Sequence, residues 1–192
     1  MAETRITAGV WRGRVVYTGR SMATRPTTAR VREALFNILG ATVARARVLD
    51  LFAGAGTIGF EALSRGAAAV TFVERDRPAA ALITRTAGHL GCADRVRLVV
   101  DDVAGWITRH QTEVRAVDLC YVDAPYGDDG IDQVLARLGG CAPALVVCEH
   151  HRARRLPDRA GGLERTRQAG YGMAQLSFYR RGAESTGREG RG

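Results

Sequence analysis

The sequence has 192 residues, which is enough for one domain with a full hydrophobic core and short for two. Hydrophobic residues make up 46% and charged residues 25%, as in ordinary globular proteins, and no apolar run approaches the ~20 residues of a membrane span. The four cysteines lack metal-ligand spacing, so we expect reduced buried thiols, no metal and a cytoplasmic protein. A membrane protein and a disulfide-rich secreted domain are excluded.

The net charge of +8 is distributed unevenly along the chain. Residues 1–47 carry a net charge of +7, residues 48–151 carry −5 and residues 152–192 carry +6. Because basic segments bind polyanions, this pattern predicts a catalytic body between two flanks that bind nucleic acid. All 28 basic residues are arginine, a side chain that suits phosphate contacts and base stacking.

The N-terminal segment reads differently from the rest of the chain. Residues 5–20 carry β-type side chains interrupted by glycines, which predicts a small, irregular, basic hairpin. An amphipathic helix is predicted over residues 29–39, with Thr27 or Thr28 as its N-cap. We therefore separate an N-terminal extension, residues 1–24, from a main domain, residues 25–181.

From residue 46 onward, short apolar runs alternate with amphipathic stretches. The predicted strands are residues 46–52, 69–74, 95–100, 117–122 and 144–148. The predicted helices end near residue 65, span 78–90, begin near 103 and span 131–138. This alternation predicts an α/β fold with a doubly wound parallel sheet. Two last strands, 163–168 and 174–179, form an antiparallel hairpin that completes seven strands, and residues 182–192 should be disordered.

A glycine-rich turn follows the first predicted strand of this sheet. Gly54, Gly56 and Gly59 fit the G-x-G-x-x-G pattern of dinucleotide-binding folds, in which the backbone approaches a ligand beside a helix N-terminus. Asp50 precedes Gly54 by four residues and completes the D-x-x-x-G-x-G pattern typical of methyltransferases. This second pattern favours S-adenosylmethionine over a nicotinamide dinucleotide as the ligand.

Carboxylates end the next two strands at the same edge of the sheet. Glu74 closes the second strand, where a carboxylate can accept both hydroxyls of a ribose. Asp101 and Asp102 close the third strand, where a carboxylate can accept an adenine amine and the next backbone N–H can reach a ring nitrogen. Register favours Asp102 for that contact, although a helix N-cap explains it equally well.

The segment Asp123-Ala124-Pro125-Tyr126 follows the fourth strand and resembles the [DN]-P-P-[YF] motif of amino-group methyltransferases. An exocyclic base amine is a poor nucleophile because its lone pair is delocalised into the ring. Asp123 and the Ala124 carbonyl can accept its two hydrogens, while the Tyr126 ring stacks on the base. Ala124 stands where the motif has proline, which keeps the carbonyl but loses backbone rigidity. Glu149, at the end of the fifth strand, is a further candidate for the substrate pocket.

The whole chain resembles the RsmD family of small-subunit ribosomal RNA guanine-N2 methyltransferases. The similarity rests on R-I-x-x-G-x-x-R-G-R at residues 5–14, R-P-T-T-A-R-V-R-E-A-L-F-N at 25–37 and L-D-L-F-A-G-A-G-T-I-G at 49–59. It runs to about Arg180 and is densest over residues 25–76. Besides Ala124, the chain departs at Gly172-Met173-Ala174, where the family usually has an acid after the glycine.

The resemblance implies a class I S-adenosylmethionine-dependent methyltransferase with a Rossmann-like fold. We expect no metal, because the methyl donor is already activated. We also expect a monomer that does not associate with a membrane. Its substrate would be small-subunit (16S) ribosomal RNA, free or in a ribosomal particle. The candidate catalytic residues are Asp123, Ala124, Pro125 and Tyr126. The candidate cofactor-binding residues are Asp50, Phe52, Ala53, Gly54, Gly56, Glu74, Arg75, Asp102 and Val103. The candidate RNA-binding residues are Arg5, Arg12, Arg14, Arg25 and Arg30.

Other functions remain open on the sequence. A DNA adenine-N6 methyltransferase shares the D-P-P-Y motif, although the chain has no sizeable insertion for recognising a DNA sequence. A protein glutamine methyltransferase usually has Asn in place of Asp123. A catalytically inactive RNA-binding assembly factor on the same fold is the alternative outside enzymes, and a nicotinamide dehydrogenase is the remaining one.

Overall fold

The computed structural model describes residues 2–19, 28–125 and 130–182. Four sequence predictions concern residues outside these ranges. They are Thr27 as a helix cap, Arg25 as an RNA contact, Tyr126 as the stacking ring and disorder of the tail beyond residue 182.

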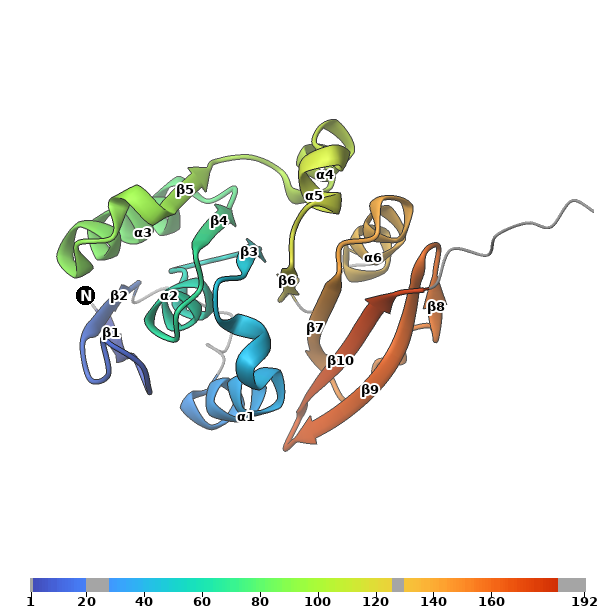
Figure 1. Ribbon diagram of the computed structural model, residues 1–192, viewed down its shortest axis with the longest axis horizontal. Helices are drawn as coiled ribbons and strands as arrows, with labels where there is room; N and C mark the ends of the chain where they lie inside the picture. The colour runs from blue at the N-terminus through green and yellow to red at the C-terminus, as the bar shows by residue number, and fades with distance from the viewer. Residues whose placement is uncertain (1, 20–27, 126–129, 183–192) are drawn as a thin grey trace, which may run out of the picture.

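A mainly parallel sheet of eight strands forms the centre of the described protein, with the strand order β5-β4-β3-β6-β7-β10-β9-β8 (Figure 1). Its strands are β3 (Arg47–Leu51), β4 (Ala69–Val73), β5 (Val96–Val99), β6 (Leu119–Val122), β7 (Leu145–His151), β8 (Arg159–Ala160), β9 (Leu163–Tyr171) and β10 (Ala174–Arg181). Strands β3 to β7 pair in parallel, whereas β8, β9 and β10 are antiparallel to their neighbours. This confirms the doubly wound sheet with a terminal hairpin.

Helices cover both faces of the sheet and enclose two hydrophobic cores. One face carries α1 (Ala29–Leu39), α2 (Thr57–Ser64) and α3 (Arg77–Leu90). The other carries α4 (Val103–Arg109), α5 (Gln111–Arg115) and α6 (Gly130–Cys141). Two short 3-10 turns, η1 (Gly40–Val43) and η2 (Ala93–Arg95), lead into β3 and β5. Helix α1 begins as predicted, because the Thr28 hydroxyl accepts a hydrogen bond from the Val31 N–H at 3.3 Å.

The sheet differs from the prediction at its C-terminal edge. The predicted seven strands become eight, because Arg159–Ala160 forms a two-residue strand, β8, against the start of β9. Strand β9 also runs three residues beyond the predicted end, to Tyr171, which pairs with Ala174. The chain therefore reverses over only Gly172 and Met173, a tight two-residue turn. The sequence did not reveal the full length of β9, because most of its residues are polar or half-buried and give no clear hydrophobic pattern.

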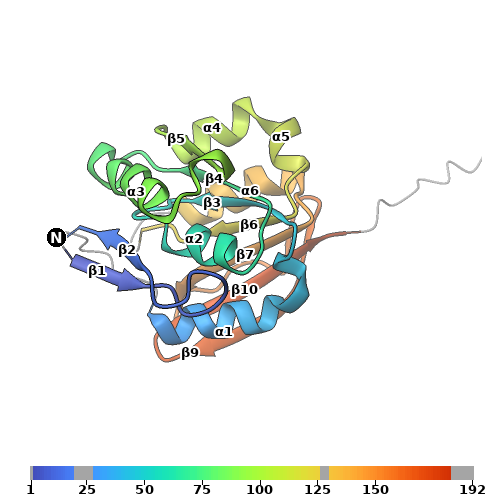
Figure 2. The ribbon, with the colours of Figure 1, turned by 60° about the vertical axis from the view of Figure 1, so that its left-hand side comes forward.

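The N-terminal hairpin is confirmed, but it begins earlier than predicted. Strands β1 (Ala2–Arg5) and β2 (Val15–Thr18) pair antiparallel and lie next to α2 and α3 (Figure 2). Ile6, Trp11 and Val16 are buried in the same core as α1 and α2. The hairpin is therefore packed against the main domain and shares its hydrophobic core.

Glu61, a fully buried residue of α2, fastens this hairpin to the domain. Its carboxylate accepts hydrogen bonds from the Thr7 N–H at 2.9 Å, the Thr7 hydroxyl at 2.6 Å and the Ala8 N–H at 3.1 Å. The guanidinium of Arg65 donates to the same carboxylate at 3.0 Å. A buried carboxylate is stable only when it has such partners, so Glu61 and the hairpin depend on each other.

Replacing Glu61 should therefore destabilise the whole domain. We expect Glu61→Ala to lower the unfolding free energy by about 3–5 kcal/mol, because Arg65 and three donors of the hairpin lose a buried acceptor. Urea unfolding measures this loss. Glu164→Ala is the control, since its half-exposed pair with Arg159 is worth at most about 0.5 kcal/mol. A loss below about 1 kcal/mol for Glu61→Ala would contradict the fastening role.

Candidate active site

The carboxyl ends of β3, β4, β6 and β7 meet at one edge of the sheet because these strands are parallel neighbours. In doubly wound folds, this edge is where ligands bind. The predicted catalytic and cofactor-binding residues that the structure describes lie at or after the ends of β3, β4 and β6, or follow β5, which pairs in parallel with β4. The fold therefore brings together segments that are far apart in the sequence.

The turn between β3 and α2 has an unusual backbone at Phe52. Its φ of 57° lies in the left-handed region, which side chains other than glycine and asparagine rarely adopt. A tight turn follows, closed by the Gly56 N–H donating to the Ala53 carbonyl at 2.7 Å. Gly56 ends it with a φ of 76°, and a Cβ there would lie 2.9 Å from the Phe72 ring. Such strain concentrates at ligand-binding segments, and here it lies in the predicted cofactor loop.

Gly59 and Asp50 hold the first turn of α2 against the sheet. A Cβ on Gly59 would lie 2.2 Å from the Phe72 ring, so only glycine allows this close approach. The Gly59 N–H donates to Asp50 Oδ2 at 3.0 Å. Asp50 is 2% exposed, and its burial raises the pKa of the carboxyl to about 8. In the structure, Asp50 therefore holds the loop and helix in place from within the core.

Glu74 lies directly after β4 and contacts the glycine-rich turn. Its Oε2 accepts from the Gly54 N–H at 2.8 Å, and its Oε1 accepts from the Asp76 N–H at 2.7 Å. The side chain is 9% exposed. These two bonds fix the orientation of the Glu74 carboxylate beside the turn. Arg75, the next residue, is exposed at the same edge of the sheet. Each carboxylate oxygen can accept a second hydrogen bond, so the geometry leaves Glu74 suited to a ribose.

Asp102 is the N-cap of α4, as one of its two interpretations predicted. Its Oδ2 accepts a hydrogen bond from the Gly105 N–H at 2.8 Å. The side chain of Val103, the first residue of α4, is buried. Asp101 instead pairs with Arg109. The structure thus distinguishes the two acids: Asp101 is engaged in an ion pair, and Asp102 caps the start of α4.

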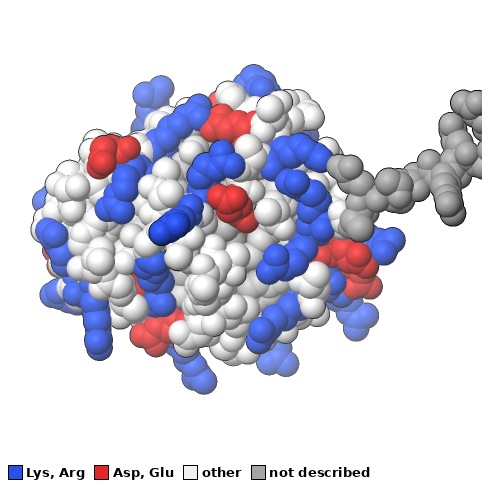
Figure 3. Space-filling model, viewed as in Figure 1, with Lys and Arg blue, Asp and Glu red and all other residues white. Residues whose placement is uncertain are grey.

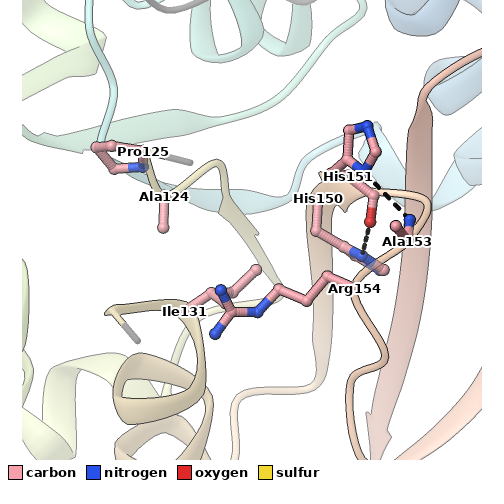
Figure 4. Close-up of a pocket in the computed structure, with 7 residues that line it drawn as sticks. All are labelled: Ala124, Pro125, Ile131, His150, His151, Ala153 and Arg154. Atoms are coloured by element: carbon pink, nitrogen blue, oxygen red, sulfur yellow. Dashed lines mark hydrogen bonds between the residues drawn. The ribbon is translucent and has the colours of Figure 1, made fainter. Parts of the chain in front are cut away.

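Asp123, Ala124 and Pro125 follow β6, with Asp123 half-buried and Ala124 8% exposed. Ala124 and Pro125 line a cavity of about 380 Å³ together with Ile131, His150, His151, Ala153 and Arg154 (Figure 4). In Figure 4 the His151 carbonyl contacts the His150 ring, and the Ala153 N–H donates to the His151 ring at 3.2 Å. The predicted acceptor segment therefore opens onto a pocket large enough for a small ligand.

Two further residues of this region were underestimated from sequence. The Tyr121 hydroxyl donates to Glu149 Oε2, and the Glu149 side chain is 4% exposed. From the sequence, Tyr121 looked like an ordinary strand residue. Tyr121 and Glu149 are 28 positions apart, and nothing in the sequence indicates a bond between them. Glu149 lines a second cavity of about 400 Å³, between the start of α1 and the β9–β10 turn.

The described candidate RNA-binding residues are all exposed, but they lie on two elements. Arg5, Arg12 and Arg14 belong to the N-terminal hairpin, and Arg30 belongs to the first turn of α1. Two of them also contact the protein backbone: Arg5 donates to the Gly13 carbonyl at 2.8 Å and Arg14 to the His89 carbonyl at 2.7 Å. Arginines are spread over the face of the molecule in Figure 3, with few acidic groups between them.

Comparison with known proteins assigns the family. A sequence model of the family described as Conserved hypothetical protein 95 matches residues 4–180. Ribosomal RNA small subunit methyltransferase D of Escherichia coli (strain K12) is 33% identical over 186 residues, which cover 95% of this chain and 92% of that protein. The protein of the same name from Haemophilus influenzae is 35% identical over 136 residues, 71% of this chain and 70% of that protein. The chain belongs to the RsmD family.

Solved structures confirm the fold class. The Escherichia coli protein yhhF superposes with a TM-score of 0.82 at 28% identity, covering 95% of this chain and 100% of that chain. TrmN from Thermus thermophilus, at 21% identity, gives a TM-score of 0.63 over 83% of this chain and 51% of that chain, a likeness of fold alone. This member of the RsmD family therefore has the class I methyltransferase fold.

No group of three or more His, Cys, Asp or Glu side chains within residues 2–19, 28–125 and 130–182 is arranged to hold a metal ion. Within the same ranges, no helix is both long and apolar enough to cross a membrane. The four cysteines are buried and free.

The buried Asp50 should make stability depend on pH. Its pKa is raised from 3.8 to about 8 by burial, so the folded state keeps a proton that the unfolded chain releases. Stability from this group is complete below about pH 4 and declines toward about pH 8, by at most about 1.4 kcal/mol per pH unit. Asp50→Asn keeps an acceptor for Gly59 and removes the titration. We expect the variant to gain stability relative to wild type between pH 5 and pH 8.

The comparison is made by urea unfolding of both proteins at several pH values in that range. Other carboxylates titrate in both proteins, and their contributions cancel in the difference. A difference that stays constant with pH would show that Asp50 is already ionised in the folded protein.

Proposed function

We propose that this protein transfers a methyl group from S-adenosylmethionine to the exocyclic N2 amine of a guanine in small-subunit ribosomal RNA in the cytoplasm. The observation that carries the proposal is the position of Asp123-Ala124-Pro125, directly after β6 and next to the strand that leads into the glycine-rich turn. The names of the relatives in Escherichia coli and Haemophilus influenzae support ribosomal RNA as the substrate.

The strained turn and the buried carboxylate fit S-adenosylmethionine. The backbone of Phe52, Ala53, Gly54 and Gly56 would surround the methionine part, and Glu74 would accept the ribose hydroxyls. Asp102 and the Val103 N–H would contact the adenine, beside Arg75. When bound, S-adenosylmethionine supplies a methyl group that is already activated as a sulfonium. Asp50 would act indirectly, by holding Gly59 and hence the turn.

The acceptor segment would prepare the amine for attack. Asp123 and the Ala124 carbonyl accept its two hydrogens, which draws the nitrogen lone pair out of the ring. Pro125 restricts the backbone directly after the Ala124 carbonyl. Tyr126 would stack on the base and hold it in line with the methyl group. Such prearranged acceptors act mainly in the transition state, when positive charge develops on the nitrogen.

The RNA would be held by the arginines of the hairpin and of α1. Arg5, Arg12, Arg14 and Arg30 lie on the surface, and Arg25 belongs to the segment between the two elements. We propose residues 1–24 as an RNA-contacting extension of the methyltransferase domain, residues 25–181, acting as a monomer on free RNA or on a ribosomal particle. Arginine contacts with phosphates would place the target guanine at the sheet edge.

The direct test of the reaction is mass mapping of modified nucleosides in small-subunit RNA from cells with and without the gene. Loss of one N2-methylguanine is expected. Loss of an N6-methyladenine from DNA, or of no modified nucleoside at all, would support the adenine enzyme or the inactive assembly factor instead.

Asp123 should matter for the chemical step and little for cofactor binding. We expect Asp123→Ala to slow methyl transfer by at least about a hundredfold, because one acceptor of the amine hydrogens is lost. A single-turnover assay with saturating S-adenosylmethionine measures this step. Affinity for S-adenosylmethionine, measured by calorimetry, should stay close to that of the wild type.

Glu74→Ala is the complementary control. Here S-adenosylmethionine binding should weaken by about 1–3 kcal/mol, since the ribose hydroxyls lose a charged acceptor. A near-normal transfer rate for Asp123→Ala would show that another group activates the amine, and unchanged affinity for Glu74→Ala would remove it from the cofactor site.

The contribution of the hairpin to RNA binding is best tested by point substitutions. Deleting residues 1–20 would remove the buried Ile6, Trp11 and Val16 from the hydrophobic core and expose the residues they cover, so a loss of binding could reflect unfolding. We expect the double substitution Arg12→Ala and Arg14→Ala to reduce the salt dependence of RNA binding by up to about two units of slope, because two phosphate contacts are lost. The control is Arg137→Ala on the exposed side of α6, which should leave the slope unchanged.

A further inference from the structure

Glu149 occupies an unusual position for a charged side chain, because it is 4% exposed and yet lines a cavity. That cavity of about 400 Å³ is bounded by Thr28, Arg30 and Val31 of α1 and by residues 170–174 of the β9–β10 hairpin. Buried carboxylates are retained where they meet a hydrogen-bond donor. The cavity thus presents a carboxylate to whatever enters it.

The strand register brings Asp123 and Glu149 to neighbouring positions at the carboxyl edge of the sheet. Val122, the last residue of β6, pairs with Cys148 of the parallel strand β7; Asp123 directly follows Val122, and Glu149 directly follows Cys148. Neighbouring strands are about 4.8 Å apart. Tyr121 and Val147, two positions earlier, both belong to the core on the α1–α3 face, and the period of two places Asp123 and Glu149 toward that same face.

The Tyr121 hydroxyl orients Glu149 by donating to its Oε2. Tyr121 is 2% exposed and lies one strand away, so the bond ties the carboxylate to the rigid centre of the sheet. A second shared element links this cavity to the acceptor segment: His151 lines both the cavity of Glu149 and the cavity of Ala124 and Pro125. The cavity of Glu149 and the cavity beside the acceptor segment therefore adjoin at His151.

We propose that Glu149 is the residue that selects guanine, by accepting the N1–H of the base while Asp123 accepts a hydrogen of the neighbouring N2 amine. The inference rests on the proposed methyl transfer to guanine and assigns the specificity of that same site. Guanine carries these two donors next to each other on its Watson–Crick edge, which is read when a base leaves its stack.

Adenine would fail at this position. Beside its exocyclic amine it presents a ring nitrogen with a lone pair and no hydrogen, which would face the Glu149 carboxylate. A site built around a hydrogen bond rejects analogues that lack the matching donor, because the buried acceptor is then left unsatisfied. Glu149 would thus separate guanine from adenine in a motif that both kinds of methyltransferase share.

The test uses an RNA stem-loop that contains the target guanine found by mass mapping. Three versions carry guanine, inosine or 2-aminopurine at the target position. Inosine has the N1–H and lacks the amine, whereas 2-aminopurine has the amine and lacks the N1–H. For the wild type, we expect inosine RNA to keep the contact with Glu149 but to bind more weakly than guanine RNA, because the amine hydrogens that Asp123 and the Ala124 carbonyl accept are missing. Transfer to 2-aminopurine should be slower in kcat/KM by about a hundredfold or more.

Glu149→Gln supplies the decisive comparison. The glutamine amide can donate to the bare N1 of 2-aminopurine, so the guanine to 2-aminopurine ratio of kcat/KM should fall by about tenfold or more. Glu164→Gln, the same change at a half-exposed position of β9, should leave the ratio unchanged. An unchanged ratio in a folded Glu149→Gln protein would overturn the proposal, and so would equal rates for both bases in the wild type.

Tyr121→Phe is a second variant that tests the same role if Glu149→Gln does not fold. It keeps the carboxylate and removes the hydroxyl that orients it, so the ratio should fall by about threefold or more, and an unchanged ratio would count against the proposal. If the wild type transferred no methyl group to the guanine hairpin, the proposed function would fail. The relative affinities for inosine and 2-aminopurine RNA, with and without Glu149→Gln, would then decide the selectivity of Glu149 alone.

Discussion

The contact between Gly59 and the sheet is the constraint on which the site depends. Because glycine has no side chain, the first turn of α2 lies against the Phe72 ring, where a Cβ would come within 2.2 Å of it. The Asp50 carboxylate holds the Gly59 N–H from the strand below. This short connection forces the backbone at Phe52 into the left-handed region and brings the Gly54 N–H to Glu74. The geometry of the turn thus follows from close packing of one helix.

Buried carboxylates give this strongly basic protein its internal organisation. Asp50, Glu61, Glu74 and Glu149 are each at most 9% exposed, and each accepts a hydrogen bond from a different element. On the face shown in Figure 3, arginines are more widespread than acidic side chains. Other acids are exposed and paired with arginines at the surface, whereas these four hold groups inside the molecule.

The sequence predicted the order of strands and helices and the residues at the strand ends, because these features are local. Hydrophobic periodicity identified β3 to β7, and parallel pairing then brought Asp50, Glu74 and Asp123 to one edge. What it missed depends on contacts over long distances in the chain. Glu61 looked like one more polar residue of an amphipathic helix, yet its partners are 53 and 54 positions away. The position of Glu149 beside Asp123 became visible only once β6 and β7 were in register.

The bond between the hairpin and α2 has a consequence for how the chain folds as it is made. The hairpin is translated before α2, and its acceptor Glu61 follows 54 residues after Thr7. At synthesis rates of about 5–20 residues per second, the hairpin waits roughly 3–10 seconds for its partner. During that interval Ile6, Trp11 and Val16, which end up buried, have no core to enter. The hairpin is therefore packed in its final place only after α2 has been translated.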